Sequence, residues 1–517
     1  MRRMRCSRVW CVGVAVMLLA VSAWSVDIAV NPAKEFQTIE GFGAHGSMVP
    51  WWEGGPHYND AFIRTVIDDM GLTMLRNEYY PSGDPQCDFN KQKPYLQAMD
   101  SYAKQHGVPL RFITSLWSPP AYMKTNNSIK DGGNLKTTSY TEFGDYLLNA
   151  IRAYKDIGID LYALSIQNEP EFSQFYNSCV YSDVQYRDAL KAVGPRIRSE
   201  FPNVKMFGPE TMLAGGNLYI RATLQDPEAR KHLDVIAYHG YSDGVRPSPT
   251  TIMSTMWRQT AGVAANHGMD VWMTETSGYS ENWGGAFELA GAIYAALYHG
   301  NMSAWVWWQL SERGMSEYVL MNNGTPGIRY YASKQFYRYI RPGAVRIESE
   351  SPDEDVYVVA FNDKSANQFV AVALNYADES KTISFSNPEV PAQLRMIQTT
   401  ASDRTADQGL KPKTGISLPP SSVVTLVGDN FAPSTAVSPR QTQTAGRIAV
   451  ASGAYTARIY GLDGTLVRTI ENVRVGSDGR FSWDRLSDAG SAVAAGAYRT
   501  VLTGAGGAAV AGPMFIN

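Results

Sequence analysis

The feature that most constrains this chain of 517 residues is an alternation that repeats eight times between residues 38 and 340. In each repeat, a short run rich in β-branched and aromatic residues is followed by a stretch with helical spacing. Eight such units predict a (β/α)8 barrel, and a doubly wound open sheet is the alternative that needs no closure. The expected strands are TIEGFGA (38–44), TMLRNEYY (73–80), PLRFITSLW (109–117), LYALSIQNEP (161–170), VKMFGPE (204–210), LDVIAYHGY (233–241), DVWMTETSG (270–278) and SAWVWWQL (303–310).

Polar and aromatic residues gather at the carboxyl ends of these runs, whereas the beginnings are aliphatic. The endings read HGS, RNEYYPSG, SLWSPP, QNEP, HGY, TETSG and WWQL. In (β/α)8 enzymes the active site lies at the C-terminal ends of the strands, where the βα loops begin. The asymmetry therefore predicts that residues 38–340 form a catalytic barrel.

The pattern changes after the barrel segment. Short alternating runs separated by Asn, Asp, Ser and Gly fill residues 341–430 and predict an antiparallel β-sandwich. Residues 26–37 are also strand-like, and we expect them to add an N-terminal strand to this side sandwich. Residues 431–445 are rich in Pro, Ser, Thr and Gln, as in a linker. Residues 446–517 are again β-rich, with D-G turns, and predict a small module that carries no catalytic constellation.

The N-terminus has the features of a secretory signal peptide. Four arginines precede an apolar run, and AWS at 23–25 resembles a small-x-small cleavage site, so we assign residues 1–25 to the signal. We find no other apolar stretch near the roughly 18 residues that a membrane span needs. The mature protein is therefore expected outside the cell or at its surface, without a membrane span.

The four cysteines leave two alternatives open. Cys6 and Cys11 lie in the signal segment, so Cys87 and Cys179 remain in the mature chain. In a secreted protein these two could form a disulfide. Two free, buried thiols are an equally good interpretation.

Charge and motif content exclude several function classes. The net charge is −3, and no basic patch stands out, so we expect no nucleic-acid partner. The seven histidines show no metal-ligand spacing, and neither a G-x-S-x-G elbow nor a P-loop nor a Rossmann glycine pattern is present. We therefore expect no metal and no cofactor. Aromatic residues are abundant, with 12 Trp, 29 Tyr and 18 Phe, which favours stacking on sugar rings but also occurs in Trp-rich cores.

Two glutamates stand at the ends of predicted strands. Glu169 lies near the end of the fourth predicted strand, and Glu275 lies near the end of the seventh, 106 positions later. A partly desolvated carboxyl group holds its proton more tightly and can act as a general acid, although an isolated Glu here would more often form a salt bridge. In a closed barrel these two strand ends face each other across the mouth. Two carboxyl groups about 5–5.5 Å apart would allow double displacement at a sugar carbon.

Four polar residues near these glutamates are candidates for supporting roles. Asn168 can hydrogen-bond a sugar 2-hydroxyl, or simply form a turn before proline. Arg76, at the end of the second strand, can hold the nucleophile ionised and oriented, unless it forms a surface ion pair. His239 and Tyr241, at the end of the sixth strand, can orient Glu275 or touch the substrate.

Four aromatic residues at or just beyond strand ends are candidate sugar platforms. We expect at least some of them to stack on substrate, while any single one could belong to the core. They are Trp117, Tyr279, Trp283 and Trp308.

At these positions the sequence resembles glycoside hydrolase family 30. The resemblance spans roughly residues 26–430. The stretches that carry it are QTIEGFGAHGS (37–47), SLWSPPAYMKTNNSIKDGGNLK (115–136), ALSIQNEP (163–170), VWMTETSG (271–278), AWVWWQL (304–310) and RPGAVRI (341–347).

The resemblance implies a (β/α)8 barrel fused to a side β-sandwich that is built from the N-terminal strand and the segment after the barrel. It also implies retaining hydrolysis, with Glu169 as the acid/base and Glu275 as the nucleophile. These roles agree with those expected from the position of the two residues at strand ends.

Within the family, the WSPPAYMKTN stretch and compact loops are most similar to bacterial xylanases, which implies an endo-β-1,4-xylanase of plant cell walls. Members that require glucuronic acid branches carry an arginine directly after the WW of the last strand. Here Ser311 and Glu312 occupy the nearest positions and Arg313 is displaced, so strict dependence on glucuronoxylan is not expected.

Other activities of the same family are alternatives: β-1,6-glucanase, β-1,6-galactanase and glucosylceramidase. A non-catalytic carbohydrate-binding protein on a decayed barrel is a further alternative, although both carboxylates are present. The C-terminal module resembles small immunoglobulin-like domains of secreted bacterial proteins, some of which are export or surface-sorting signals. Secretion or surface-anchoring machinery is therefore a possible partner, besides the polysaccharide.

Overall fold

The structure is a computed structural model of the chain. It describes residues 25–46, 59–79, 89–212, 217–241, 248–433, 453–461, 465–475, 487–488, 496–504 and 509–516. The chain divides into two compact units, Met1–Pro433 and Ser434–Asn517. Within the described residues, no helix combines the length and the apolar character needed to cross a membrane.

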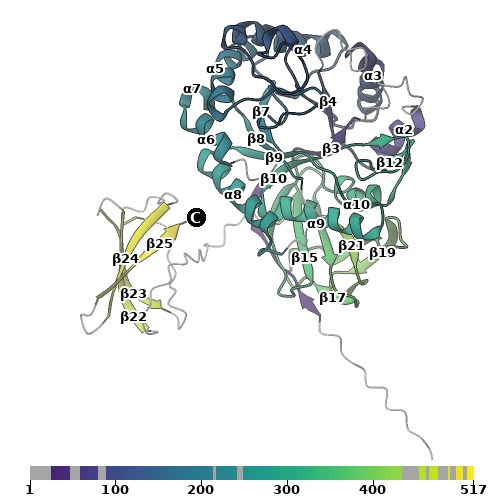
Figure 1. The fold of residues 1–517 in the computed structure, drawn as a ribbon. Coiled ribbons are helices and arrows are strands. Elements are labelled where there is room, and N and C mark those ends of the chain that lie inside the picture. The colour runs from purple at the N-terminus through teal and green to yellow at the C-terminus, as the bar shows by residue number, and fades with distance from the viewer. Residues whose placement is uncertain are drawn as a thin grey trace, which may run out of the picture. The chain divides into compact units, whose positions relative to one another are not determined.

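Eight parallel strands form a closed barrel, which confirms the predicted fold (Figure 1). Each strand pairs with the next along the chain, and the last pairs with the first, in the order β10-β3-β4-β5-β6-β7-β8-β9. The eight predicted runs all contain a strand, and most of these strands are shorter than expected because the polar ends leave the sheet. The strands are β3 (Gly41–His45), β4 (Met74–Glu78), β5 (Arg111–Ser115), β6 (Ala163–Ser165), β7 (Lys205–Thr211), β8 (Val235–His239), β9 (Asp270–Glu275) and β10 (Met302–Trp307).

Helices cover the outside of the barrel and bury their apolar faces against its strands. Local sequence sets several of their ends: Ser182 and Gln185 form a capping box, and Gly268 adopts the left-handed conformation after the last turn of α8. The helices are α2 (Asp60–Arg64), α3 (Phe89–Gln105), α4 (Tyr140–Asp156), α5 (Asp183–Glu200), α6 (Asn217–Gln225), α7 (Pro227–Arg230), α8 (Ile252–His267), α9 (Trp283–His299) and α10 (Ile328–Tyr337), with single-turn or π-helical segments at Thr65–Asp69, Ala121–Met123 and Thr137–Ser139.

The interior of the barrel is packed rather than open. A cluster of apolar side chains that includes Met74, Phe207 and Trp272 fills it. At the N-terminal end of the strands, Glu40 accepts hydrogen bonds from Trp272 Nε1 at 3.3 Å, from Lys205 Nζ at 2.8 Å and from the hydroxyl of Tyr162. Hydrogen-bonded polar side chains therefore fill the N-terminal end of the barrel. An active site is expected at the opposite end, where the strands finish.

A β-sandwich follows the barrel in the first unit. Its larger sheet has the order β19-β18-β21-β16-β15-β14-β2, in which the N-terminal strand β2 pairs antiparallel with β14. Helices α9 and α10 lie between the barrel and this sheet (Figure 1). The strands of the larger sheet are β2 (Ala29–Thr38), β14 (Val345–Glu350), β15 (Val356–Asp363), β16 (Gln368–Asn375), β18 (Gln393–Thr399), β19 (Ala406–Pro412) and β21 (Ser422–Asp429).

Two small sheets complete the first unit. One has the order β1-β17-β20 and shares an apolar core with the larger sheet. The other, β11-β12-β13, follows the last barrel strand. Their strands are β1 (Val26–Asp27), β17 (Lys381–Ser384), β20 (Ile416–Leu418), β11 (Ser311–Glu312), β12 (Met321–Asn322) and β13 (Thr325–Pro326).

The second unit contains a four-stranded antiparallel sheet in the order β23-β22-β24-β25. Its small apolar core includes Ala457, Ile459, Val473 and Leu502. The strands are β22 (Gly453–Tyr460), β23 (Leu466–Val475), β24 (Gly496–Gly504) and β25 (Ala509–Ile516).

Three sequence predictions fall wholly or mostly outside the described residues. They are the signal peptide, most of the linker at 431–445, and one of the two cysteines, Cys87. The other cysteine, Cys179, is a buried free thiol.

Candidate active site

Glu169 lies in the loop that leaves β6, the fourth strand of the barrel. The backbone of the neighbouring Asn168 donates to Leu116 O at 2.7 Å, and that of Glu169 donates to Glu210 O at 3.2 Å. Glu169 adopts a φ of 43°, in the left-handed region that is costly for a residue with a Cβ. Two neighbouring strand ends thus hold this buried glutamate in a conformation that it would rarely adopt alone.

Glu275 is the last residue of β9, the seventh strand, and two donors fix its carboxylate. Arg76 NH1, from β4, donates to Oε2 at 2.5 Å. The hydroxyl of Tyr241, from the loop after β8, donates to Oε1 at 2.5 Å. Both oxygens of Glu275 therefore accept hydrogen bonds, as a carboxylate does, and its rotamer is locked.

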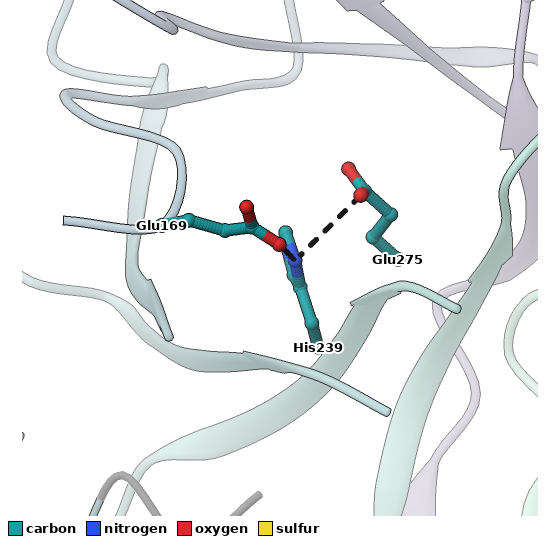
Figure 2. A group of neighbouring side chains, drawn as sticks. All are labelled: Glu169, His239 and Glu275. Carbon is teal, nitrogen blue, oxygen red and sulfur yellow. Dashed lines mark hydrogen bonds and ion pairs between the residues drawn. The ribbon is translucent and has the colours of Figure 1, made fainter. Parts of the chain in front are cut away.

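His239, at the end of β8, lies between the two glutamates (Figure 2). Its Nδ1 is 3.0 Å from Oε1 of Glu169 and 3.8 Å from Oε1 of Glu275. One oxygen of each glutamate and one ring nitrogen of His239 all lie within 4.8 Å of one another. The barrel therefore brings the two carboxyl groups face to face at its C-terminal end, as the sequence predicts.

A third glutamate, Glu210, was not among the residues selected from the sequence. It is fully buried in β7, with a φ of 58°, and its Oε1 accepts from Arg76 NH2 at 3.0 Å. His239 Nε2 lies 3.7 Å from the same oxygen. The sequence contains a pattern that predicts this residue, because Glu210 ends the apolar run VKMFGPE just as Glu275 follows an apolar run.

The charges of this cluster depend on each other. Burial alone would lower the pKa of His239, but the carboxylates of Glu275, Glu169 and Glu210 outweigh it and raise that pKa to about 10. For Glu210, burial opposes ionisation, yet Arg76 and His239 lower its pKa to about 2. The carboxylates of Glu210 and Glu275 raise the pKa of Arg76 despite its complete burial. The site thus contains two fixed cations among three acidic side chains.

Asn168 joins the cluster through its side chain. Its Oδ1 accepts from Arg76 NH2 at 2.8 Å. This bond fixes the orientation of the amide and leaves the amide NH2 as the group that can donate to a substrate hydroxyl. Arg76 thereby positions both Glu275 and Asn168.

Two of the four aromatic candidates lie beside this cluster. The guanidinium of Arg76 lies 4.7 Å from the ring centroid of Trp117, which is buried. Trp308 is half-buried, with its ring 6.0 Å from Trp117 and 4.2 Å from His45. Trp117 therefore packs against the guanidinium of Arg76, while Trp308 remains partly exposed and stays a candidate for stacking on a sugar.

The other two aromatic candidates, Tyr279 and Trp283, pack against Trp307 and against the sandwich. Tyr279 is 1% exposed and packs against Trp307, so no sugar ring can reach it. Trp283 begins α9, and its Nε1 donates to Ser421 O of the sandwich at 3.0 Å. The prediction for Tyr279 was therefore wrong, because that ring is buried, whereas Trp283 is half-buried and its role in binding sugar stays a prediction.

The three groups of Figure 2 are close enough to hold a cation, but their donor chemistry does not suit one. The oxygens of Glu275 already accept from Arg76 and Tyr241, and His239 Nδ1 already contacts Glu169. A metal ion would also lie beside the permanent charge of Arg76. The arrangement is suited to holding and transferring protons.

Comparisons with known proteins agree with this geometry. The family models of the glycosyl hydrolase family 30 TIM-barrel domain and of the family 30 β-sandwich domain match residues 81–343 and 343–426. The glucuronoxylanase XynC of Bacillus subtilis (strain 168) is 26% identical over 425 residues, which cover 78% of this chain and 91% of that protein. The lysosomal acid glucosylceramidase of Mus musculus is 24% identical over 417 residues, covering 70% and 80% of the two chains.

Among solved structures, the family 30 subfamily 8 xylanase Xyn30A from Clostridium acetobutylicum matches with a TM-score of 0.66 and 28% identity. The match covers 78% of this chain and 99% of the xylanase. The sequence models and the barrel-plus-sandwich architecture agree, and the chain belongs to glycosyl hydrolase family 30, a family of glycosidases.

Proposed function

We propose that the protein is a retaining endo-β-1,4-xylanase in which Glu169 is the acid/base and Glu275 is the nucleophile. The observation that carries the proposal is the close approach of their carboxyl groups, which have one oxygen each within the same 4.8 Å cluster. Retaining glycosidases separate these groups by about 5–5.5 Å, whereas inverting enzymes need about 6.5–9.5 Å to admit a water. The shorter separation favours double displacement.

The hydrogen bonds favour this division of roles over its reverse. Glu275 accepts from Arg76 and Tyr241 on its two oxygens, which suits a nucleophile that must be ionised and aimed. Within the part of the chain that the structure describes, the Glu169 carboxyl group contacts His239 through Oε1, so its other oxygen can carry a proton toward the scissile bond. The partners around each carboxylate support this assignment of roles.

The reaction then proceeds in two steps. Glu275 attacks the anomeric carbon, while Glu169 gives its proton to the leaving oxygen, and a glycosyl ester forms on Glu275. Glu169 next removes a proton from water, which attacks the same carbon and releases Glu275. Arg76 and Asn168 orient the reacting groups in both steps. Arg76 fixes the nucleophile, and the Asn168 amide donates to the sugar 2-hydroxyl.

Xylan is the substrate that the observations favour. The relatives include proteins named glucuronoxylanase and xylanase, alongside glucosylceramidases and the endo-1,6-β-D-glucanase of Neurospora crassa. In this chain the segment after the last barrel strand carries Ser311 and Glu312, and Glu312 accepts from Gln309 Nε2 at 2.7 Å. A carboxylate here would repel a glucuronic acid branch, so we propose that the enzyme does not require one.

Incubation with four polymers tests the proposal. Purified protein is mixed with glucuronoxylan, arabinoxylan, β-1,6-glucan or β-1,6-galactan, and the products are sized. We expect a ladder of oligosaccharides from both xylans and none with Glu275→Gln. Cleavage restricted to a β-1,6-linked polymer would contradict the proposed linkage, and sugar binding without turnover would favour a non-catalytic binding protein.

We also propose that the enzyme works outside the cell. Xylan is an insoluble polymer that cannot enter a cell intact, and residues 1–25 have the pattern of a secretory signal. The C-terminal module, whose sequence resembles export or surface-sorting domains, would then serve the machinery of secretion or anchoring. Deleting residues 434–517 should leave xylan cleavage unchanged and alter how much enzyme reaches the cell surface or the medium.

A further inference from the structure

The loop between β6 and α5, which contains Glu169, carries three exposed aromatic side chains. Phe175 is 82% exposed, Tyr176 39% and Phe172 37%. Large apolar side chains on a soluble surface are individually common, but three within five residues beside a reaction centre are not. Their position next to the proposed acid/base suggests a role in holding substrate.

The loop is held in place by the neighbouring loop between β5 and α4. Asp131 N donates to Gln174 O at 2.8 Å, and Ser178 N donates to Ile129 O at 3.0 Å. From the same neighbouring loop, the buried ammonium of Lys124 donates to Ser178 O at 2.5 Å. The aromatic rings are therefore presented on a backbone that is already ordered, which lowers the entropic cost of binding.

The rings of Phe175 and Tyr176 form an edge-to-face pair, with centroids 5.2 Å apart and planes at 79°. The segment that carries the pair is tied to the reaction centre, since Phe172 N donates to Glu169 O at 3.0 Å. Burial, and then the negative charges of Glu169 and Glu275, raise the pKa of Tyr176. The more exposed Phe175 lies on the outer side of the pair.

We propose that Phe175 and Tyr176 form a binding subsite for a neutral pyranose ring on the leaving-group side of the scissile bond. This inference rests on the proposed function, because Glu169 must stand on the leaving-group side in order to protonate the leaving oxygen. A loop that continues from Glu169 then flanks the sugar that departs. A ring face of Phe175 or Tyr176 supplies apolar stacking, and the hydroxyl of Tyr176 supplies a hydrogen bond.

The same subsite gives the glycosyl-enzyme a second possible acceptor. When a sugar occupies it, the hydroxyl oxygen of that sugar bonds to the anomeric carbon and the ester bond to Glu275 breaks, with its electron pair returning to the carboxylate. The hydroxyl proton passes to Glu169. The subsite thus favours transfer to sugar over hydrolysis when oligosaccharides are concentrated.

The test compares Phe175→Ala and Tyr176→Ala with wild type on whichever of the four polymers the wild type cleaves. Leu410→Ala is the matched control, because this side chain is also highly exposed but lies in β19 of the sandwich. We expect KM to rise about tenfold in each loop variant while kcat stays within about twofold, since stacking on the leaving sugar is present before and during reaction. The ratio of transfer to hydrolysis, measured with concentrated oligosaccharide products, should fall in parallel.

Each outcome decides between a binding and a purely structural role. A fall in kcat at unchanged KM would mean that the rings only position Glu169, and would overturn the subsite. Kinetics and transfer ratios equal to those of wild type would also overturn it, while leaving the proposed xylanase function intact. A wild-type enzyme that cleaves none of the polymers would contradict the proposed function and the subsite with it.

Discussion

Arg76 on the second barrel strand donates to Oε2 of Glu275 on the seventh over 2.5 Å. The two residues are 199 positions apart, and only the closure of the barrel brings them together. The guanidinium also contacts Glu210 and Asn168, with the ring of Trp117 beneath it. Arg76 is therefore the residue through which the fold holds the reaction centre in one geometry.

Replacing this arginine should reduce catalysis without changing the fold. For Arg76→Lys we expect kcat/KM on xylan to fall about 100-fold, because one ammonium cannot reproduce the fork that fixes Glu275 and Asn168 together. Initial rates measure the loss of catalysis, and far-UV circular dichroism checks that the fold is unchanged. Arg152→Lys is the control, since Arg152 pairs with Glu200 on the exterior helices, and loss of activity in that variant as well would argue against a specific role for Arg76.

Substrates with different leaving groups test the role of Glu169. In Glu169→Ala we expect hydrolysis of xylan to fall about 1,000-fold, because the departing sugar needs a proton. An aryl xyloside with a good leaving group should still form the glycosyl-enzyme, since its phenolate departs unprotonated. The measurement is the pre-steady-state release of the phenol. Equal losses on both substrates would contradict the acid role.

The charge on His239 should appear in the pH dependence of stability. Its folded pKa is raised from 6.5 to about 10, so its stabilising contribution is complete below 6.5 and is lost as the pH rises through 10. The groups that face it are Glu169, Glu210 and Glu275, which favour the imidazolium. The difference in unfolding free energy between wild type and His239→Gln should therefore be largest at low pH.

Urea unfolding followed by tryptophan fluorescence at about pH 6, 8 and 10 checks this difference. We expect about 3 kcal/mol at the lowest pH, decreasing toward the highest. His106→Gln is a suitable control, because that side chain is exposed just after α3, where it bonds the backbone carbonyl of Tyr102 and stacks on its ring, away from any carboxylate of the site. A difference for His239 that grows with pH would contradict the assignment of an imidazolium.

At the opposite end of the barrel, Glu40 should affect stability and not chemistry. It joins Lys205, Tyr162 and Trp272 where the strands begin. Glu40→Gln keeps the shape but removes the charge that Lys205 faces, which should cost about 2–3 kcal/mol of unfolding free energy. Thermal unfolding measures the loss. Turnover per folded molecule at a temperature well below unfolding should be unchanged, and a reduced kcat there would contradict this separation.

The barrel could be predicted from sequence because its signal is periodic. Each parallel strand buried on both faces reads as an apolar run, and each polar ending marks the same edge of the sheet. The approach of Glu169 and Glu275 follows from counting strands, since strands four and seven lie across the barrel. Glu210 had the same signal at the end of strand five and could have been selected by the same rule.

The sequence analysis was less successful for residues beyond the strand ends. There, no hydrophobic periodicity indicates the direction in which the chain continues. Tyr279 follows β9 closely but is buried against Trp307, and Trp283 begins α9 and bonds to the sandwich. The loop that carries Phe175 is held by hydrogen bonds to residues more than 40 positions away. Such contacts depend on loop geometry, which local propensity does not encode.

Covalent trapping tests the central claim most directly. A 2-deoxy-2-fluoro xylobioside with a dinitrophenol leaving group should form a slowly hydrolysed ester, because the fluorine destabilises the positive charge of the transition state for release. Peptide mass mapping of the inactivated enzyme should then find one sugar adduct, on Glu275. An adduct on Glu169 or elsewhere, or no adduct in an enzyme that cleaves xylan, would contradict the proposed double displacement across this pair of glutamates.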